Sequence, residues 1–164
     1  MVESIRMVEE RFSGIPRIRV VDMGFGTCEL SDGTLVKYRV AVVDVRVLRK
    51  ESPFGVEFEA NLATGISVYP SKKVLEEYRD KRILTPGESP PSSWKQVRIV
   101  NREPAFEEVE FESEDIGRYR IRVEVEPVMA SVNTEVRIVH GEPYYVIRWI
   151  PKMSWEKVVE ESGG

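Results

Sequence analysis

The feature of this sequence that most constrains its fold is a strictly alternating segment, Arg118 to Glu126. Hydrophobic side chains occupy every odd position of the segment, and arginine or glutamate occupies every even position. Alternation with a period of two is typical of a β-strand that buries one face. Such a strand needs a paired neighbour and a second layer to cover its hydrophobic face. We therefore expect a mainly β protein.

The residues just before this segment supply a matching strand. A hairpin that turns at Ser113–Gly117 places glutamates opposite arginines on one face and hydrophobic residues opposite each other on the other face. The predicted cross-strand pairs are Glu112–Arg118, Glu110–Arg120, Glu108–Arg122, Phe111–Tyr119 and Val109–Ile121. Each such pair contributes about 0.2–1 kcal/mol. Because a slip of one residue would break all of them together, the register of this hairpin is well determined.

Three further hairpins are predicted from their turn residues. Gly141–Glu142 fits a two-residue type II′ turn, Asp32–Gly33 fits type I′, and Lys50–Pro53 joins the fourth hairpin. The pairs expected around Gly141–Glu142 are Ile138–Tyr145, Val136–Ile147, Thr134–Trp149 and Glu135–Arg148. Those around Asp32–Gly33 are Leu30–Leu35 and Thr27–Tyr38. Those around Lys50–Pro53 are Val47–Val56, Val45–Phe58, Val43–Ala60 and Arg46–Glu57.

The segment Thr34–Lys50 serves two of these hairpins and is unusually long for one strand. Its hydrophobic residues fall at even positions up to Val42 and at odd positions from Ala41 onwards. A change of phase within an unbroken strand indicates a β-bulge or a crossing from one sheet to another. We therefore expect an antiparallel β-sandwich or a partly open barrel of about eight to ten strands.

Helices are expected to be few. Ser71 can cap a helix over residues 71–83, which would end before Pro86. Short helices are also predicted near the two ends of the chain, at Ser4–Phe12 and Ser154–Glu161. The Pro- and Ser-rich segment at residues 85–93 is interpreted as a loop within a single domain that spans residues 1–164.

Composition narrows the classes of protein to consider. The 24 Lys and Arg against 28 Asp and Glu give a formal net charge of −4, which provides no electrostatic reason to expect nucleic-acid or membrane binding. No apolar run approaches the ~18–20 residues that span a bilayer, and the acidic N-terminus does not resemble a signal peptide. The single cysteine excludes an internal disulfide. We expect a soluble cytoplasmic protein, whose scarcity of Asn and Gln is typical of thermophiles.

Two carboxylates form the first candidate site. The register expected for the hairpin at Lys50–Pro53 places Asp44 opposite Glu59. Like charges directly opposite each other are destabilising, so a pair of this kind is typical of a metal site or of a shared proton. The simpler interpretation is that Arg46, two residues along the strand, neutralises both carboxylates.

Few other residues suggest chemistry. His140, the only histidine, precedes the turn at Gly141 and is a candidate general acid or base, although a solvated loop residue is the simpler interpretation. Zinc sites need several His or Cys ligands and the chain has one of each, so no histidine-based metal site is expected, and no cofactor is predicted. Cys28 is interpreted as a small buried hydrophobe. Gly24 and Gly26 lack the context of a dinucleotide fingerprint and indicate a β-bulge or a close approach of backbones instead.

The least ordinary surface is the back face of the hairpin around Gly141. Its residues are Val139, Tyr144, Val146 and Ile150, with Arg137 and Arg148 among them. A face this apolar is not normally left in water. We expect either the C-terminal helix or a partner chain to cover it, and the partner would be another protein or a second copy bound through residues 132–150.

Three functions remain open from the sequence. The first is a non-enzymatic module that binds a protein or a small ligand, and the absence of a strong catalytic motif favours it. The second is an enzyme that uses Asp44 and Glu59, with or without a metal. The third is a nucleic-acid-binding barrel, but the facing glutamates favour a salt-bridge ladder over a phosphate-binding surface. The arginines in question are Arg118, Arg120 and Arg122, with Arg17, Arg19, Arg98 and Arg102 elsewhere.

Overall fold

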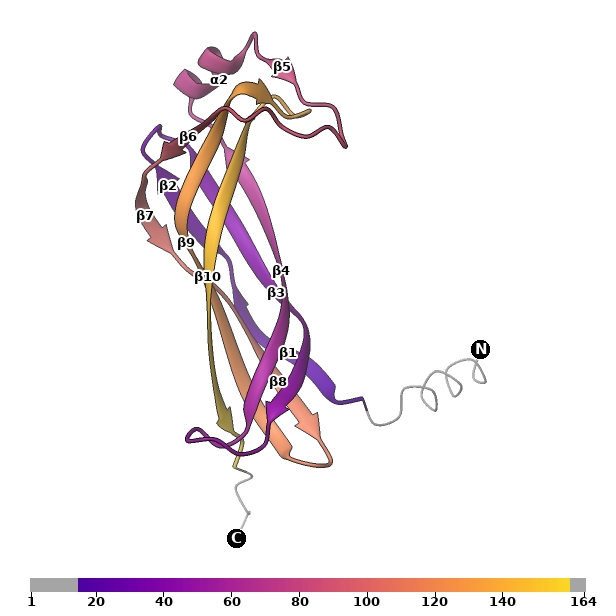
Figure 1. Cartoon of the computed structure of the whole chain (residues 1–164). Coiled ribbons are helices and arrows are strands. Elements are labelled where there is room, and N and C mark those ends of the chain that lie inside the picture. Colours follow the sequence, from indigo (N-terminus) through magenta and orange to yellow (C-terminus); the bar gives the residue numbers. More distant parts are fainter. Residues whose placement is uncertain (1–14, 160–164) are drawn as a thin grey trace, which may run out of the picture.

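A computed structural model describes residues 15–159, which form two β-sheets and one helix, α2 (Lys72–Tyr78). The strands are β1 (Arg17–Gly24), β2 (Gly26–Leu30), β3 (Leu35–Arg49), β4 (Glu57–Tyr69), β5 (Arg82–Ile83), β6 (Trp94–Val97), β7 (Ile99–Glu103), β8 (Ala105–Ser113), β9 (Gly117–Arg137) and β10 (Pro143–Lys157). The molecule is elongated, with α2 at one end and the β3–β4 and β8–β9 turns at the other (Figure 1).

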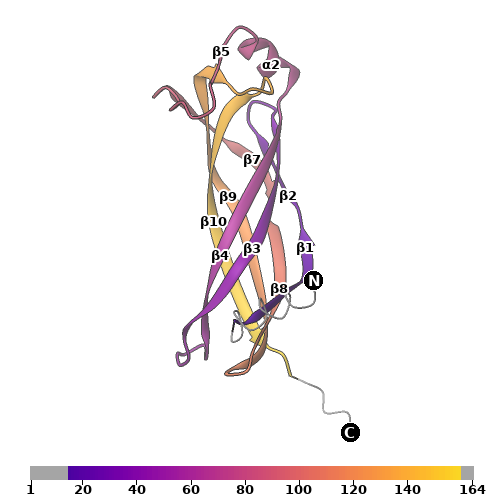
Figure 2. The same cartoon turned by 90° about the vertical axis from the view of Figure 1, so that its right-hand side faces the viewer.

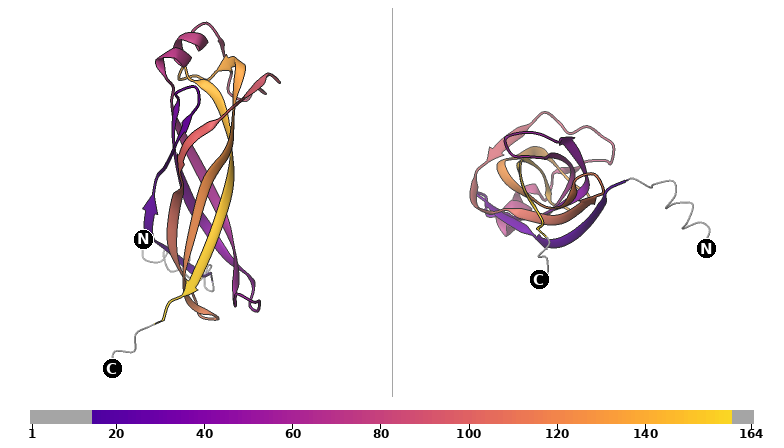
Figure 3. Two further views of the ribbon diagram at one scale, coloured as in Figure 1. Left: turned by 90° about the vertical axis from the view of Figure 1, so that its left-hand side faces the viewer. Right: turned by 90° about the horizontal axis from the view of Figure 1, so that it is seen from below.

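The two sheets face each other around a shared core. One sheet has the order β1-β8-β9-β10, with β5 and β6 also paired to β9, and the other has the order β4-β3-β2-β7. All pairs are antiparallel except the short β5–β9 pair. Seen from below, the strands surround the core without joining into one continuous ring of pairs (Figure 3). The expected sandwich or open-barrel class is confirmed.

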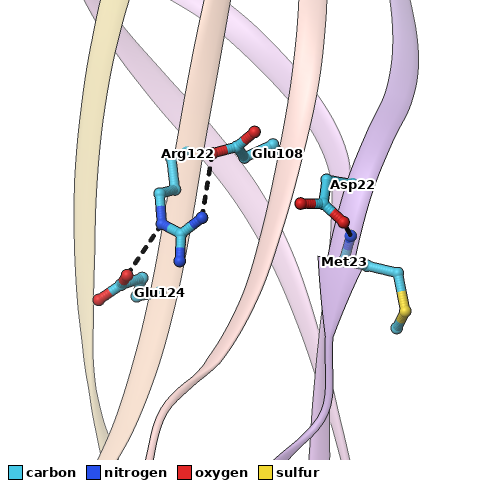
Figure 4. Close-up of polar contacts among 5 residues, drawn as sticks. All are labelled: Asp22, Met23, Glu108, Arg122 and Glu124. Atoms are coloured by element: carbon cyan, nitrogen blue, oxygen red, sulfur yellow. Dashed lines mark hydrogen bonds and ion pairs between the residues drawn. The ribbon is translucent and has the colours of Figure 1, made fainter.

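The β8–β9 hairpin has the predicted register in full. Every one of the pairs expected between residues 108–112 and 118–122 is present. On the outer face, Arg122 lies between Glu108 and Glu124, at 3.0 Å and 2.9 Å (Figure 4). Asp22 on the neighbouring strand β1 accepts a hydrogen bond from the Met23 N–H in the same view. Glu110 is shared by Arg118 at 3.1 Å and Arg19 at 3.2 Å, so the glutamates pair with arginines from both neighbouring strands.

The predicted change of phase in β3 is also confirmed. Val36, Tyr38 and Val40 are buried at even positions, and Val45 is buried at an odd one. The register against β4 shifts between Val42 and Asp44, as expected for a β-bulge. The bulge therefore keeps hydrophobic residues facing the other sheet along the whole strand.

Glu107 on β8 stabilises this bulge from within the core. Its side chain is 2% exposed, and its Oε1 accepts a hydrogen bond of 2.9 Å from the Val42 N–H. Arg39 lies 3.9 Å from the other carboxylate oxygen. A buried N–H without a partner costs about 1–3 kcal/mol, so the carboxylate satisfies a donor that the neighbouring strands leave free.

We expect Glu107→Ala to lower the free energy of unfolding by about 1–3 kcal/mol, because it leaves the Val42 N–H unpaired in the core. Glu107→Gln retains an acceptor oxygen and should cost less than about 1 kcal/mol. Denaturant titration followed by circular dichroism measures both changes. Equal losses for the two variants would contradict the role assigned to this hydrogen bond.

Aromatic side chains join the two sheets. At the end opposite α2, the Phe58 ring contacts Phe111, Tyr119 and Trp155 edge-on, at centroid distances of 5.2, 5.0 and 5.6 Å. Nearer α2, Tyr38 contacts Trp149 at 4.7 Å. Edge-to-face pairs of this kind add about 0.5–1.5 kcal/mol beyond the burial of their area.

Two turns differ from the prediction in the same way. In the turn after β2, Gly33 donates to the Leu30 carbonyl and the Leu30 N–H donates to Thr34. In the turn after β9, the Gly141 N–H donates to the Ile138 carbonyl, and the Ile138 N–H donates to the Glu142 carbonyl. The type I′ turn expected at Asp32–Gly33 needs positive φ at both residues, but only Gly33 has it, and the bonds around Ile138 place Gly141 at the end of its loop rather than at the start. Both are three-residue loops that end in a glycine bulge.

The longer loops shift the register of both hairpins, so the pairs predicted for them are wrong. Tyr38 pairs with Gly26 rather than Thr27, and Leu35 with Glu29 rather than Leu30. In the β9–β10 hairpin, further register shifts follow along the strands. The observed pairs there are Tyr145–Val132, Ile147–Ala130, Arg148–Met129 and Trp149–Pro127.

The β3–β4 hairpin is also displaced from its predicted register. Its loop extends to a turn in which Gly55, at φ +76°, donates to the Ser52 carbonyl. The turn is therefore centred further along the chain than Lys50–Pro53. The observed pairs are Val47–Phe58, Arg46–Glu59, Val45–Ala60 and Asp44–Asn61.

The helix predictions are partly right. Ser71 caps α2 through a bond from the Val74 N–H, but the helix ends at Tyr78, and the Arg82–Ile83 strand pairs with β9. The helix expected at Ser154–Glu161 is wrong, because β10 continues to Lys157 against the long β9. The helix expected at 4–12 lies outside the described residues. Within the described part of the chain, no helix is long and apolar enough to cross a membrane.

A buried polar network holds α2 against the end of the sheets. Tyr145 donates to Asp32 at 2.6 Å, and its hydroxyl lies 3.0 Å from the buried Thr34 hydroxyl. Tyr78 of α2 donates to the Asn133 carbonyl at 2.9 Å. Burial raises the pKa of the Tyr145 hydroxyl, so this group stays protonated and acts as a donor.

Candidate functional site

The two candidate carboxylates do not face each other. Asp44 lies opposite Asn61, and Glu59 lies opposite Arg46, because the β3–β4 hairpin is shifted from the predicted register. The Asp44 carboxylate accepts a bond of 2.9 Å from the neighbouring Val45 N–H. Among the described residues, no group of three or more His, Cys, Asp or Glu side chains is placed to hold a metal ion.

His140 and Cys28 lie in ordinary surroundings. His140 is exposed in the loop between β9 and β10. Burial raises the pKa of the nearby Glu142 carboxyl, and His140 opposes that shift. Burial raises the pKa of the Cys28 thiol to about 11, although Arg102 acts in the opposite direction. This thiol is therefore protonated at neutral pH and belongs to the core.

The hairpin surface is only partly covered. The helix expected over it is a strand, and Val139, Val146 and Ile150 are 61%, 46% and 47% exposed. Tyr144 packs edge-on against Trp94 of β6 at 5.6 Å. The Arg137 side chain donates to the Lys81 carbonyl at 2.9 Å, and Arg148 is exposed. The segment from α2 to β6 thus covers one end of this face.

A pocket of about 430 Å³ adjoins this surface. It lies where the chain leaves β6 in one sheet and enters β7 in the other, beside a register shift in β9. At that crossing the Arg98 carbonyl accepts a bond of 2.8 Å from the Ser31 N–H, which anchors the segment to the turn after β2. The lining residues are Gln96, Val97, Arg98, Ile99, Arg102, Val128 and Met129.

The polar part of the pocket is cationic. Arg98 and Arg102 line it, and Arg148 lies opposite Met129 in the β9–β10 pair. One Arg102 nitrogen donates to the Pro127 carbonyl at 2.8 Å, which fixes this side chain beside the pocket. Within residues 15–159, none of these three arginines forms an ion pair with a carboxylate. A guanidinium with free donors binds carboxylate or phosphate oxygens well.

The sequence alone identified only part of this arrangement. Arg98 and Arg102 stood out merely as scattered arginines, and Gln96, Val128 and Met129 gave no signal. Gln96 and Val97 lie near residues 128–129 because β6 pairs with β9, and Arg98, Ile99 and Arg102 join them where the chain crosses into the other sheet. The one available clue was Val97-Arg98-Ile99, where a charged residue separates two hydrophobic ones beside the Pro- and Ser-rich loop.

Comparison with models of protein families, with curated proteins and with solved structures gave no match.

Proposed function

We propose that the chain is a binding module, and that the pocket between β6, β7 and β9 holds an anionic ligand with an apolar part. The observation that carries this proposal is the pair Arg98 and Arg102, which line the pocket without a carboxylate partner in the described chain. Unneutralised guanidinium groups beside a concave surface favour a negatively charged ligand.

The rest of the pocket suits an apolar group. Besides the arginines and Gln96 it is lined by four hydrophobic residues, and its volume lies within the range of about 300–1,000 Å³ typical of small-molecule sites. Val97 is buried, whereas Met129 is 42% exposed. A methionine side chain adapts its shape to a bound group, so Met129 can contact ligands of variable outline.

The lining residues support binding rather than chemistry. They include no carboxylate, histidine, cysteine or hydroxyl, the side chains that most often act as nucleophiles or as general acids and bases. Gln96 adds a neutral donor and acceptor that can orient a polar ligand. Docking of a protein on the adjoining hairpin surface, residues 132–150, stays a prediction.

The proposal is tested with 8-anilinonaphthalene-1-sulfonate, a fluorescent probe that has one sulfonate and an apolar ring system. We expect the folded protein to bind it, and Arg98→Gln to weaken binding about tenfold or more, because a charge-assisted hydrogen bond contributes about 1.5–3 kcal/mol. Fluorescence titration at low salt measures the dissociation constant. Arg98 is the preferred position because its side chain makes no described hydrogen bond or ion pair.

Arg46→Gln provides the matched control. Arg46 is exposed on β3, opposite Glu59, and does not line the pocket, so its loss should leave the affinity for the probe unchanged. If Arg98→Gln binds as tightly as the wild type, or if Arg46→Gln weakens binding equally, the pocket is not the anion site.

A further inference from the structure

We infer that β4 is an interaction edge, along which two copies of this chain pair strand to strand into a dimer. The strand lies at the end of the sheet order β4-β3-β2-β7 and, among the strands of residues 15–159, pairs only with β3. In Figure 2 it runs diagonally along the side that faces the viewer. This inference goes beyond the proposed function, because it concerns a different surface and a different partner.

The first observation is that β4 carries free backbone groups. The Val42 N–H points away from β4 and bonds to Glu107 on β8. In an antiparallel pair, two residues directly opposite each other point their N–H and C=O groups either both toward the partner strand or both away from it. Leu62 is opposite Val42, so Leu62 directs its own N–H and C=O away from β3, to the open edge. The direction alternates along the strand, and the other edge-directed residues are Thr64, Ile66 and Val68. No backbone bond from another described segment reaches them.

The second observation is that this edge lacks the features that normally prevent pairing. Residues 60–69 contain no charge and no proline, in a chain with 32% charged residues. Charges, prolines, bulges and short length are the usual protection of an edge strand. The other edges have them: β1 carries charges and a bulge, β7 has five residues including Arg102, and β10 contains Pro151.

The third observation is a glycine at the centre of this segment that the fold of one chain does not require. Gly65 has an ordinary strand φ, and a Cβ built on it would meet nothing within 4 Å. Each of the other glycines among residues 15–159 has a positive φ or a close contact that excludes a side chain. A glycine inside a strand often marks the close approach of another backbone.

A second copy of the chain fits this edge better than an unrelated strand. A two-fold axis at Gly65 pairs Thr64 with Ile66 of the second copy. The backbone N–H and C=O groups that point to the edge in one copy then face those that point to the edge in the other. The same axis brings the acidic end of β4, with Glu59, beside the second copy's residues Lys72 and Lys73 at the start of α2. Glu59 lies opposite Arg46 within its own chain but is not within ion-pair distance of any described basic group, so it can also face these lysines.

The hydrophobic side chains of β4 gain burial from the same pairing. Ile66 faces the side of the sheet on which Tyr38 is buried, yet it is 44% exposed at the edge. The second copy's strand would extend the sheet over this position. The dimer would thus satisfy the free backbone groups and cover the exposed isoleucine together.

A designed disulfide tests the inference directly. Across the proposed axis Gly65 meets its own copy in a non-hydrogen-bonded pair, where the Cα atoms lie ~4.5 Å apart, within the range that a disulfide spans. Gly65→Cys should therefore form a covalent dimer under mild oxidation. Ser67→Cys, on the same face two residues away, lies opposite Ala63 of the second copy and should not. Equal crosslinking of the two variants, or none with Gly65→Cys, would overturn the proposed register.

Solution mass gives an independent measurement. Light scattering after gel filtration should give twice the monomer mass for the wild type and for Thr64→Val. Thr64→Pro removes an edge-directed N–H without touching the bonds to β3, and should raise the dimer dissociation constant about tenfold or more. Circular dichroism checks that Thr64→Pro stays folded. If it does not, the crosslinking of Gly65→Cys and Ser67→Cys tests the dimer instead. A wild-type monomer at all concentrations, or a folded Thr64→Pro that dimerises as well as Thr64→Val, would overturn the inference.

Discussion

Replacing Phe58 by alanine should lower the free energy of unfolding by about 3–5 kcal/mol, the usual cost of removing a buried phenylalanine. Phe58 is 3% exposed and contacts aromatic residues of β8, β9 and β10. It comes from β4 in one sheet and meets three strands of the other, so its loss leaves a cavity between the sheets that neither can easily fill.

Phe54→Ala is the matched control for this measurement. Phe54 lies four residues earlier, in the loop between β3 and β4, and is 78% exposed. Its truncation should change the free energy of unfolding by less than about 0.5 kcal/mol. Guanidinium titration of both variants gives the comparison. A loss below about 1 kcal/mol for Phe58→Ala would mean that the two sheets do not pack through this ring.

Gly26→Ala should be destabilising by about 3 kcal/mol, at the upper end of the cost of overpacking a core. A Cβ at this position would lie 2.1 Å from the Tyr38 ring, 2.6 Å from the Ala105 nitrogen and 2.7 Å from the Glu103 carbonyl oxygen. Two of these neighbours are backbone atoms that cannot rotate away. The alanine therefore has to push β2 away from the β7–β8 connection.

Gly65→Ala makes the same chemical change where there is space. At concentrations low enough to keep the chain monomeric, it should leave the free energy of unfolding unchanged or raise it by about 0.5–1 kcal/mol, because alanine loses less conformational freedom in a strand than glycine does. Thermal and denaturant unfolding of the two variants measure the difference. Similar losses at both positions would show that the close approach around Gly26 is absent.

The register of a hairpin was predictable from the sequence where the side chains on both faces of the two strands form matching pairs. In β8 and β9 the glutamate–arginine pairs and the hydrophobic pairs agree, and the strand order follows from them. The bulge in β3 was predictable for a related reason, because the change of hydrophobic phase after Val42 is visible in the residues themselves. The close approach at Gly26 was expected on chemical grounds and is confirmed.

The other registers depended on turn geometry, which the residues determine less strictly. Asp32–Gly33 satisfies the rules for a two-residue loop and also for a three-residue loop ending in glycine, and the second form is present. One residue of difference in the loop moves every pair in the hairpin. In the separate β3–β4 hairpin, a turn further along the chain displaced the register and removed the predicted opposition of Asp44 and Glu59.

The end of β10 shows how tertiary context decides between two local patterns. Trp155 with Val158 and Val159 suits a helix, whereas Met153 and Trp155 suit alternation in a strand. The strand prevails because β9 is long enough to pair with residues up to Lys157. The pocket was less predictable still, since its walls come from segments about thirty residues apart that share no motif.

Mapping the bound anionic probe by nuclear magnetic resonance tests the proposed function most directly. Titration of 8-anilinonaphthalene-1-sulfonate into ¹⁵N-labelled protein should shift the amide signals of the pocket residues first, above all those of Arg98, Arg102 and Met129. Signals on the outer faces of β3 and β4 should not move at the same concentration. Shifts confined to another surface, or no saturable shift at the pocket, would contradict the assignment of this pocket as the binding site.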